Sequence, residues 1–193
     1  MRNLFIGAVL SIIFSTLSYA QTQQGNFLLG GGFSASFNNN KTERPAANNT
    51  INISESRAST VSFNPKLGIF IVDGFAIGLD ADISNTSYKD KNNNTSSTAS
   101  YFAIGPFVRY YFPVNLFLEG RGGIGNGKDV AGYDKSKVFT YSVGAGYAAF
   151  LNDHIAIEPM IRYAGRNYTR VSDNAFKTRN GALEFAIGLQ IYL

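Results

Sequence analysis

The chain has 193 residues, and its 17 Lys and Arg against 13 Asp and Glu give a net charge of +4. Charged residues make up only 16% of it, against about 25% in an average soluble domain. The sequence has no cysteine and a single histidine. This composition excludes a disulfide framework, a cysteine-ligated metal site, a thiol nucleophile and any mechanism that needs two imidazoles. The length suits one domain.

The first twenty residues have the pattern of a secretory signal. Arg2 supplies a positive start, residues 4–14 are apolar, and Ser18-Tyr19-Ala20 is a small-x-small cleavage site. The apolar stretch is shorter than the roughly 20 residues that a membrane-spanning helix needs. We therefore expect residues 1–20 to be a cleaved signal peptide, and residues 21–193 to form the exported domain.

From residue 25 onward, apolar residues recur at every second position, which is the periodicity of β-strands. In the first segment, Phe27, Leu29 and Phe33 lie on one face and Gly30 and Ser34 on the other. Each segment is about ten residues long, the length of a tilted strand that crosses a bilayer. The pattern predicts eight strands, over residues 27–37, 61–71, 75–83, 102–112, 116–124, 139–147, 155–163 and 183–193.

The connections between these segments alternate between short and long. Tight turns are predicted at residues 72–74, 113–115 and 152–154, and long polar connections at residues 38–60, 85–99, 126–137 and 165–180. This alternation is typical of outer-membrane barrels. The sequence therefore predicts an all-β fold, a closed eight-stranded antiparallel up-and-down transmembrane β-barrel with short periplasmic turns and long extracellular loops.

The two faces of the predicted strands differ in a way that separates a membrane barrel from a soluble one. A soluble barrel or sandwich needs many charges on its water-facing side, whereas here the polar face is mostly Gly, Ala and Ser. The apolar face carries no charge, and a lipid-facing Lys or Arg would cost about 2–4 kcal/mol at the bilayer midplane. Outward aromatics near both strand ends predict interfacial girdles. The nine charges on the polar face are candidates for a lumen charge network: Lys66, Asp80, Asp82, Arg109, Glu119, Arg121, Glu158, Arg162 and Glu184.

The signal pattern, the eight segments and the sequence IGPFVRYYF at residues 104–112 resemble the small OmpA/OmpX-type outer-membrane barrels. The resemblance covers essentially the whole mature chain, and it implies residence in the cell outer membrane of a Gram-negative bacterium. The alternating last segment resembles the signal that the outer-membrane barrel assembly machinery reads, so this machinery is an expected partner. The chain departs from the family at its last residue, Leu193, where members usually end in Phe or Trp.

Two functions follow from the predicted lumen. In the first, the inward charges pair into a salt-bridge plug, and the protein is a non-enzymatic barrel that contributes to envelope structure and to surface adhesion through its loops. In the second, the same charges, such as Glu119 and Arg121, form the filter of a narrow channel for ions or small solutes. Some barrels of similar size are lipid A acyltransferases or deacylases that use a histidine, but His154 falls in a predicted periplasmic turn.

The predicted loops carry an excess of positive charge, which favours contact with membrane lipids, including the phosphates of lipopolysaccharide. The alternative is that the loops are solvated and bind no specific ligand. The sequence identifies no particular surface ligand for the loops. We expect no nucleic-acid partner because the cations are spread over four loops. No cofactor is predicted. Asp80 and Asp82 share a face, but two carboxylates do not make a metal site.

Overall fold

The computed structural model describes residues 19–45, 51–90, 96–128, 135–171 and 177–193. A short 3-10 helix, η1 (Tyr19–Thr22), precedes the strands. Among the described residues, no helix is long and apolar enough to span a membrane. The strands in chain order are β1 (Phe27–Pro45), β2 (Ile51–Val72), β3 (Phe75–Asp90), β4 (Ser96–Tyr111), β5 (Leu116–Lys128), β6 (Lys135–Tyr147), β7 (Ala149–Phe150), β8 (Ile155–Arg170) and β9 (Lys177–Tyr192).

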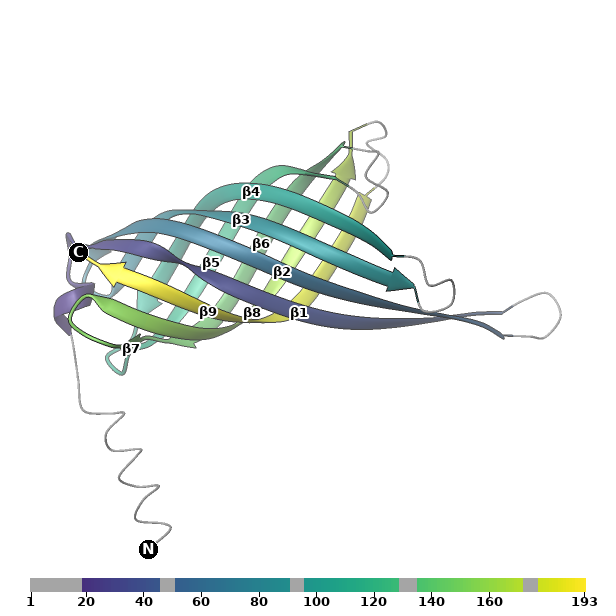
Figure 1. Cartoon of the computed structure of the whole chain (residues 1–193). Coiled ribbons are helices and arrows are strands. Elements are labelled where there is room, and N and C mark those ends of the chain that lie inside the picture. Colours follow the sequence, from purple (N-terminus) through teal and green to yellow (C-terminus); the bar gives the residue numbers. More distant parts are fainter. Residues whose placement is uncertain (1–18, 46–50, 91–95, 129–134, 172–176) are drawn as a thin grey trace, which may run out of the picture.

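These strands form a closed eight-stranded antiparallel barrel, which confirms the predicted fold class (Figure 1). Each strand pairs with its neighbours in the sequence, and β1 closes the ring by pairing with β9 from Leu28↔Tyr192 to Ala35↔Phe185. Closure leaves no free sheet edge, which is the condition for placing β-structure in lipid, where unpaired backbone groups find no water.

Strand β7 continues β6 along the same edge of β8, so it is not a ninth strand of the barrel. The pairs Gly146↔Met160 and Ala149↔Ile157 belong to one register along β8. That register puts Pro159, which has no N–H to donate, opposite the residue where β6 ends. At the break, the N–H of Ala148 donates instead to the carbonyl of Asn115 at 2.8 Å.

The side-chain distribution is the reverse of that in a soluble protein. Large apolar side chains face outward, and Phe37 is 74% exposed. Lys, Arg, Asp and Glu side chains of the strands lie in the interior along the central part of every hairpin. Aromatic residues pair on the outer surface, as in Phe33 and Phe63, whose ring centroids are 4.8 Å apart. This exterior requires a hydrocarbon environment. In water, a protein with so large an exposed apolar surface would aggregate.

The strands extend further into the predicted long connections than the sequence indicates, so the predicted bounds of these connections are wrong. The β1–β2 ladder extends to Pro45↔Ile51, so most of residues 38–60 is paired strand. Strands also continue into the connections predicted at 85–99, 126–137 and 165–180, where β3, β5 and β8 run on to Asp90, Lys128 and Arg170. Polar composition did not end the strands, because an antiparallel ladder satisfies the backbone whatever the side chains are. Past Ala35, β1 pairs only with β2, and this hairpin projects beyond the barrel wall (Figure 1).

The three short turns and the two described chain ends lie at one end of the barrel, which we call the turn end; the opposite end is the hairpin end (Figure 1). Gly74 adopts a φ of +75° in the β2–β3 turn, a conformation that favours glycine. Its N–H donates to the carbonyl of Thr22 at 2.8 Å, which ties the segment before β1 to the turn. The predicted signal peptide lies outside the described residues up to residue 18, so its cleavage stays a prediction.

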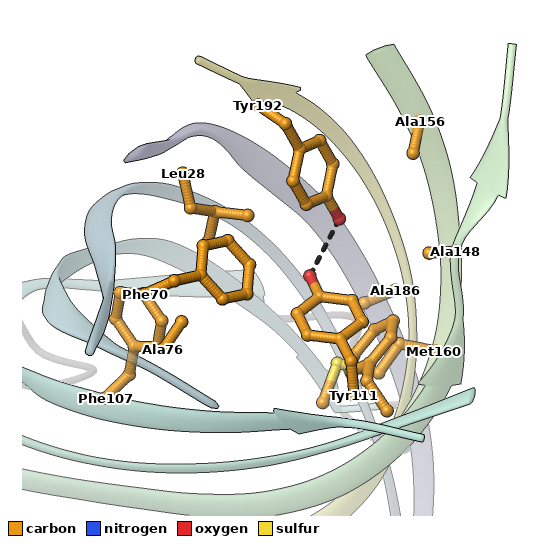
Figure 2. Close-up of a cluster of buried hydrophobic side chains, with 11 residues drawn as sticks. Leu28, Phe70, Ala76, Phe107, Tyr111, Ala148, Ala156, Met160, Ala186 and Tyr192 are labelled. Atoms are coloured by element: carbon orange, nitrogen blue, oxygen red, sulfur yellow. Dashed lines mark hydrogen bonds between the residues drawn. The ribbon is translucent and has the colours of Figure 1, made fainter. Parts of the chain in front are cut away.

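A cluster of apolar and aromatic side chains fills the lumen at the turn end. Its largest members are Phe70, Phe107, Phe117, Tyr111 and Tyr192, which are buried and come from the four strands β2, β4, β5 and β9. Figure 2 shows the hydroxyls of Tyr111 and Tyr192 meeting across the cluster, with their oxygens 2.8 Å apart. This cluster is the apolar core of the barrel and forms the floor on which the charged groups lie.

Candidate functional site

All nine charged residues singled out in the sequence lie inside the barrel. Each is 9% exposed or less, and each comes from the inward face of its strand. Alternation places them there: residues two apart on a strand share a face, so Asp80 and Asp82 on β3 point the same way, as do Glu119 and Arg121 on β5. The structure joins them in two separate clusters.

The first cluster, the Arg109 cluster, consists of Lys66, Arg109, Glu119 and Glu158 and lies on the apolar floor. The Arg109 Nε donates to Glu119 Oε2 at 2.8 Å, and its Nη1 donates to Glu158 Oε2 at 2.6 Å. Lys66 Nζ donates to the same oxygen of Glu119. Two cations and two carboxylates meet here, so the Arg109 cluster is electrically neutral.

Aromatic side chains of the apolar floor hold the Arg109 cluster from the side of the turn end. Arg109 Nη1 also donates to the Tyr111 hydroxyl at 2.7 Å, and the Arg109 guanidinium lies 4.2 Å from the centroid of the Phe117 ring. The hydroxyl of Tyr192 donates to Glu158 Oε1. Every charge of the cluster is therefore held by a partner of opposite sign, and Arg109 and Glu158 are also held by rings or hydroxyls of the floor. Such complete pairing is the condition under which a buried charge is tolerated.

The second cluster, the Arg162 cluster, consists of Asp80, Asp82, Arg121, Arg162, Arg166 and Glu184 and lies toward the hairpin end. Arg121 bridges the two aspartates, with Nε 3.1 Å from Asp80 Oδ2 and Nη2 3.3 Å from Asp82 Oδ2. Arg162 and Arg166 both bind Glu184. With three cations and three carboxylates, this cluster is neutral as well.

Hydrogen bonds run through the Arg162 cluster from wall to wall. The Tyr101 hydroxyl donates to Asp82 Oδ2 at 2.9 Å and accepts from Arg166 Nε at 2.6 Å, which links the aspartates to the Glu184 side. Arg162 Nη2 donates to Ser34 Oγ at 2.8 Å and to Asn64 Oδ1 at 3.0 Å. These bonds connect β1, β2, β3, β4, β8 and β9 across the lumen.

Between the two clusters remains a cavity of about 20 Å³. It is lined by groups from both clusters, among them Lys66, Glu119 and Arg162, and on one side by Gly32 and Gly188. A cavity of this size holds about one water molecule. From the turn end toward the hairpin end, the described part of the lumen thus holds an apolar floor, a neutral cluster, a single-water cavity and a second neutral cluster.

The sequence interpretation missed Arg166 and the inward tyrosines. Arg166 was assigned to a polar loop at residues 165–180, whereas β8 continues to Arg170 and brings Arg166 inside, 7% exposed. Two-residue alternation from Arg162 would have placed it there, had the strand not been ended at Gly165. The same alternation from Arg109 points Tyr101 and Tyr111 inward. Arg166 changes the predicted lumen charge from −1 to zero.

The described residues contain no group of three His, Asp or Glu side chains arranged to hold a metal ion. His154, the one histidine of the chain, lies exposed in the turn before β8, where its backbone N–H donates to Asn152 Oδ1 at 2.9 Å. It lies at the turn end, opposite the hairpin end.

Comparisons with known proteins agree with this geometry. The sequence profile of the outer membrane protein beta-barrel domain matches residues 6–190. The crystal structure of the outer membrane protein OprG from Pseudomonas aeruginosa superimposes with a TM-score of 0.50 at 13% identity, covering 90% of this chain and 98% of that one. The crystal structure of Neisserial surface protein A, NspA, gives a TM-score of 0.42 at 15% identity, covering 87% and 97%. Among curated proteins, none matches this sequence.

Proposed function

Because this chain belongs to the outer membrane protein beta-barrel family, we propose that it is a non-conducting, non-enzymatic barrel of the outer membrane that contributes to envelope structure. In this proposal the turn end faces the periplasm and the hairpin end faces outward. The signal peptide directs export, the barrel assembly machinery inserts the chain, and the projecting β1–β2 hairpin takes part in surface adhesion.

The observation that carries the proposal is the packing of the lumen by the described side chains from the turn end to the Arg162 cluster. Two clusters that are each neutral, together with the apolar floor, leave a cavity for one water molecule. Conduction would require the separation of ion pairs that are nearly inaccessible to solvent, and breaking such a pair typically costs about 3–5 kcal/mol. A barrel of eight strands is wide enough only to be filled by its own side chains.

A narrow channel for ions or small solutes is the second candidate function. The observation in its favour is that charged groups of both clusters line the lumen, and that Gly32 of β1 and Gly188 of β9 are among the residues that line the cavity between them. The two functions differ in one measurable property, the conductance of the folded barrel.

The test is single-channel recording of the purified barrel in a planar bilayer. Migration in a detergent gel verifies folding, because the unheated, folded barrel migrates faster than the heat-unfolded chain. We expect no discrete current steps from wild type, because the plug occupies the lumen. Steps that change with Arg121→Ala, and remain unchanged with the exterior control Lys137→Gln, would make the protein a channel and overturn the plug.

A further inference from the structure

Cations gather on the outer surface of the hairpin end, just past the apolar band. On β3, β5, β6 and β9, the outward face of the strand passes from an apolar residue to an exposed cation, as from Ile124 to Lys128 on β5. The separations are two to six residues, which places the charges about 5–15 Å beyond the band on a tilted strand. We call this set the cation belt: Lys89, Lys128, Lys137 and Arg179.

The belt lies among hydrogen-bonding groups. Lys128 pairs with Ser100 in the β4–β5 ladder, and Lys137 pairs with Thr169 and with Asn126 in the ladders on either side of β6. Exposed hydroxyls and amides at outward positions thus alternate with the ammonium groups. Such a surface offers both charge and neutral donors, which is the combination that binds phosphate oxygens.

The opposite rim has the opposite sign. The exposed charged side chains described at the turn end are Asp73 and Asp153, both carboxylates. Among the exposed side chains that the structure describes, the charges are therefore polarised along the barrel axis, cationic at the hairpin end and anionic at the turn end. A leaflet rich in phosphate at one side of the membrane complements this asymmetry.

We infer that the cation belt binds the phosphate groups of lipid A, the phosphorylated glycolipid anchor of lipopolysaccharide, in the outer leaflet around the hairpin end. This inference rests on the proposed residence and orientation in the outer membrane, and goes beyond them by assigning the lipid-binding residues. Exterior lipid binding and the state of the lumen are separate properties, so each can fail without the other.

The test measures lipid binding to the purified barrel in detergent by native mass spectrometry, and compares two lipids and two variants. The probes are diphosphorylated lipid A and lipid A with both phosphates removed. The variant K89Q/K128Q/K137Q/R179Q removes the belt, and S87Q/T98Q alters exposed outward positions at the same end without a change of charge. Faster migration in an unheated gel verifies that each protein is folded.

We expect wild type and the uncharged control to bind diphosphorylated lipid A equally. The belt variant should bind it at least about tenfold more weakly, since each surface cation contributes measurably to attraction by anionic headgroups. Wild type should discriminate against the dephosphorylated lipid to a similar degree. Binding by the belt variant within twofold of wild type, or loss of lipid A to competing inorganic phosphate at equal concentration, would overturn the inference.

Discussion

Arg109 shows how a single side chain organises the lumen. Its guanidinium reaches Glu119, Glu158 and Tyr111 at once, while its plane lies near the ring of Phe117. The fork of five donors makes arginine suited to this role, since a lysine in its place has donors at only one point. Glu119 and Glu158 both depend on Arg109. Lys66 pairs with Glu119, so Arg109 is the cation that Glu158 relies on.

We expect Arg109→Met to destabilise the barrel strongly. The change keeps an unbranched side chain but leaves Glu158 without a cation and Glu119 with Lys66 alone, at an expected cost of about 3–5 kcal/mol. The measurement is the free energy of unfolding in urea, on protein folded in lipid vesicles. The exterior control Arg179→Gln should cost less than about 0.5 kcal/mol. A loss below about 1 kcal/mol for Arg109→Met would show that the cluster contributes little to stability.

The inward position of each charge was predictable from alternation, but its partner was not. Asp82 illustrates the limit: its face follows from period two, whereas its contacts with Arg121 and Tyr101 depend on which strands lie across the lumen. Arg166 illustrates a different limit. Polar composition after Gly165 masked a strand that the backbone continues, because ladder hydrogen bonds require no apolar residues.

At the scale of elements, the hairpins are longer than the barrel wall. The β1–β2 ladder runs for many residues past Ala35, the last β1 position paired with β9. The projecting part is joined to the barrel chiefly through its own strands and the β2–β3 ladder, which continues to Ser56↔Asp90. We therefore expect the barrel to remain folded when the projecting part of the hairpin is removed.

Replacing residues 40–56 with Asn-Gly should leave the barrel folded and lower its adhesion to surfaces. The pair Asn39↔Arg57 then closes on a two-residue turn, for which Asn-Gly is the favoured sequence. Migration in an unheated gel and the thermal midpoint measure folding, and attachment of cells that express the variant measures adhesion. The midpoint should change by only a few degrees.

A deeper deletion of residues 35–61 provides the control for this experiment. It removes the pair Ala35↔Phe185 and part of the wall, so we expect it to prevent folding. Attachment that is unchanged by the shorter deletion would remove adhesion through this hairpin from the proposed function, while the barrel itself would stand.

For the molecule as a whole, closure between the first and last strands is the decisive event. Phe27 and Leu193 exchange two backbone hydrogen bonds, of 2.7 and 3.0 Å, and the Tyr192 N–H donates to the carbonyl of His154 at 2.7 Å. The Tyr192 side chain meanwhile reaches Glu158 and Tyr111 in the lumen. The chain end thus joins wall, floor and Arg109 cluster.

Removal of Tyr192 and Leu193 should prevent stable closure. The truncation deletes these backbone bonds and leaves Glu158 with fewer partners, and several hydrogen bonds of about 0.5–1.5 kcal/mol each are lost together. We expect the truncated chain to migrate as unfolded protein in an unheated gel. Leu193→Phe, which keeps the backbone, should migrate as wild type. A truncated chain with an unchanged thermal midpoint would refute the role assigned to this end.

The sequence by itself determined the strand periodicity, the number of staves, the short turns and the face on which each central charge lies. These properties are local, because alternation and turn chemistry act over a few residues. Only the tertiary structure decided the length of the hairpins, the inclusion of Arg166, and the division of the charges into two neutral clusters. Those depend on strand register and on contacts across the lumen, where groups such as Arg162 and Asn64 are far apart in the chain and meet only because the sheet closes.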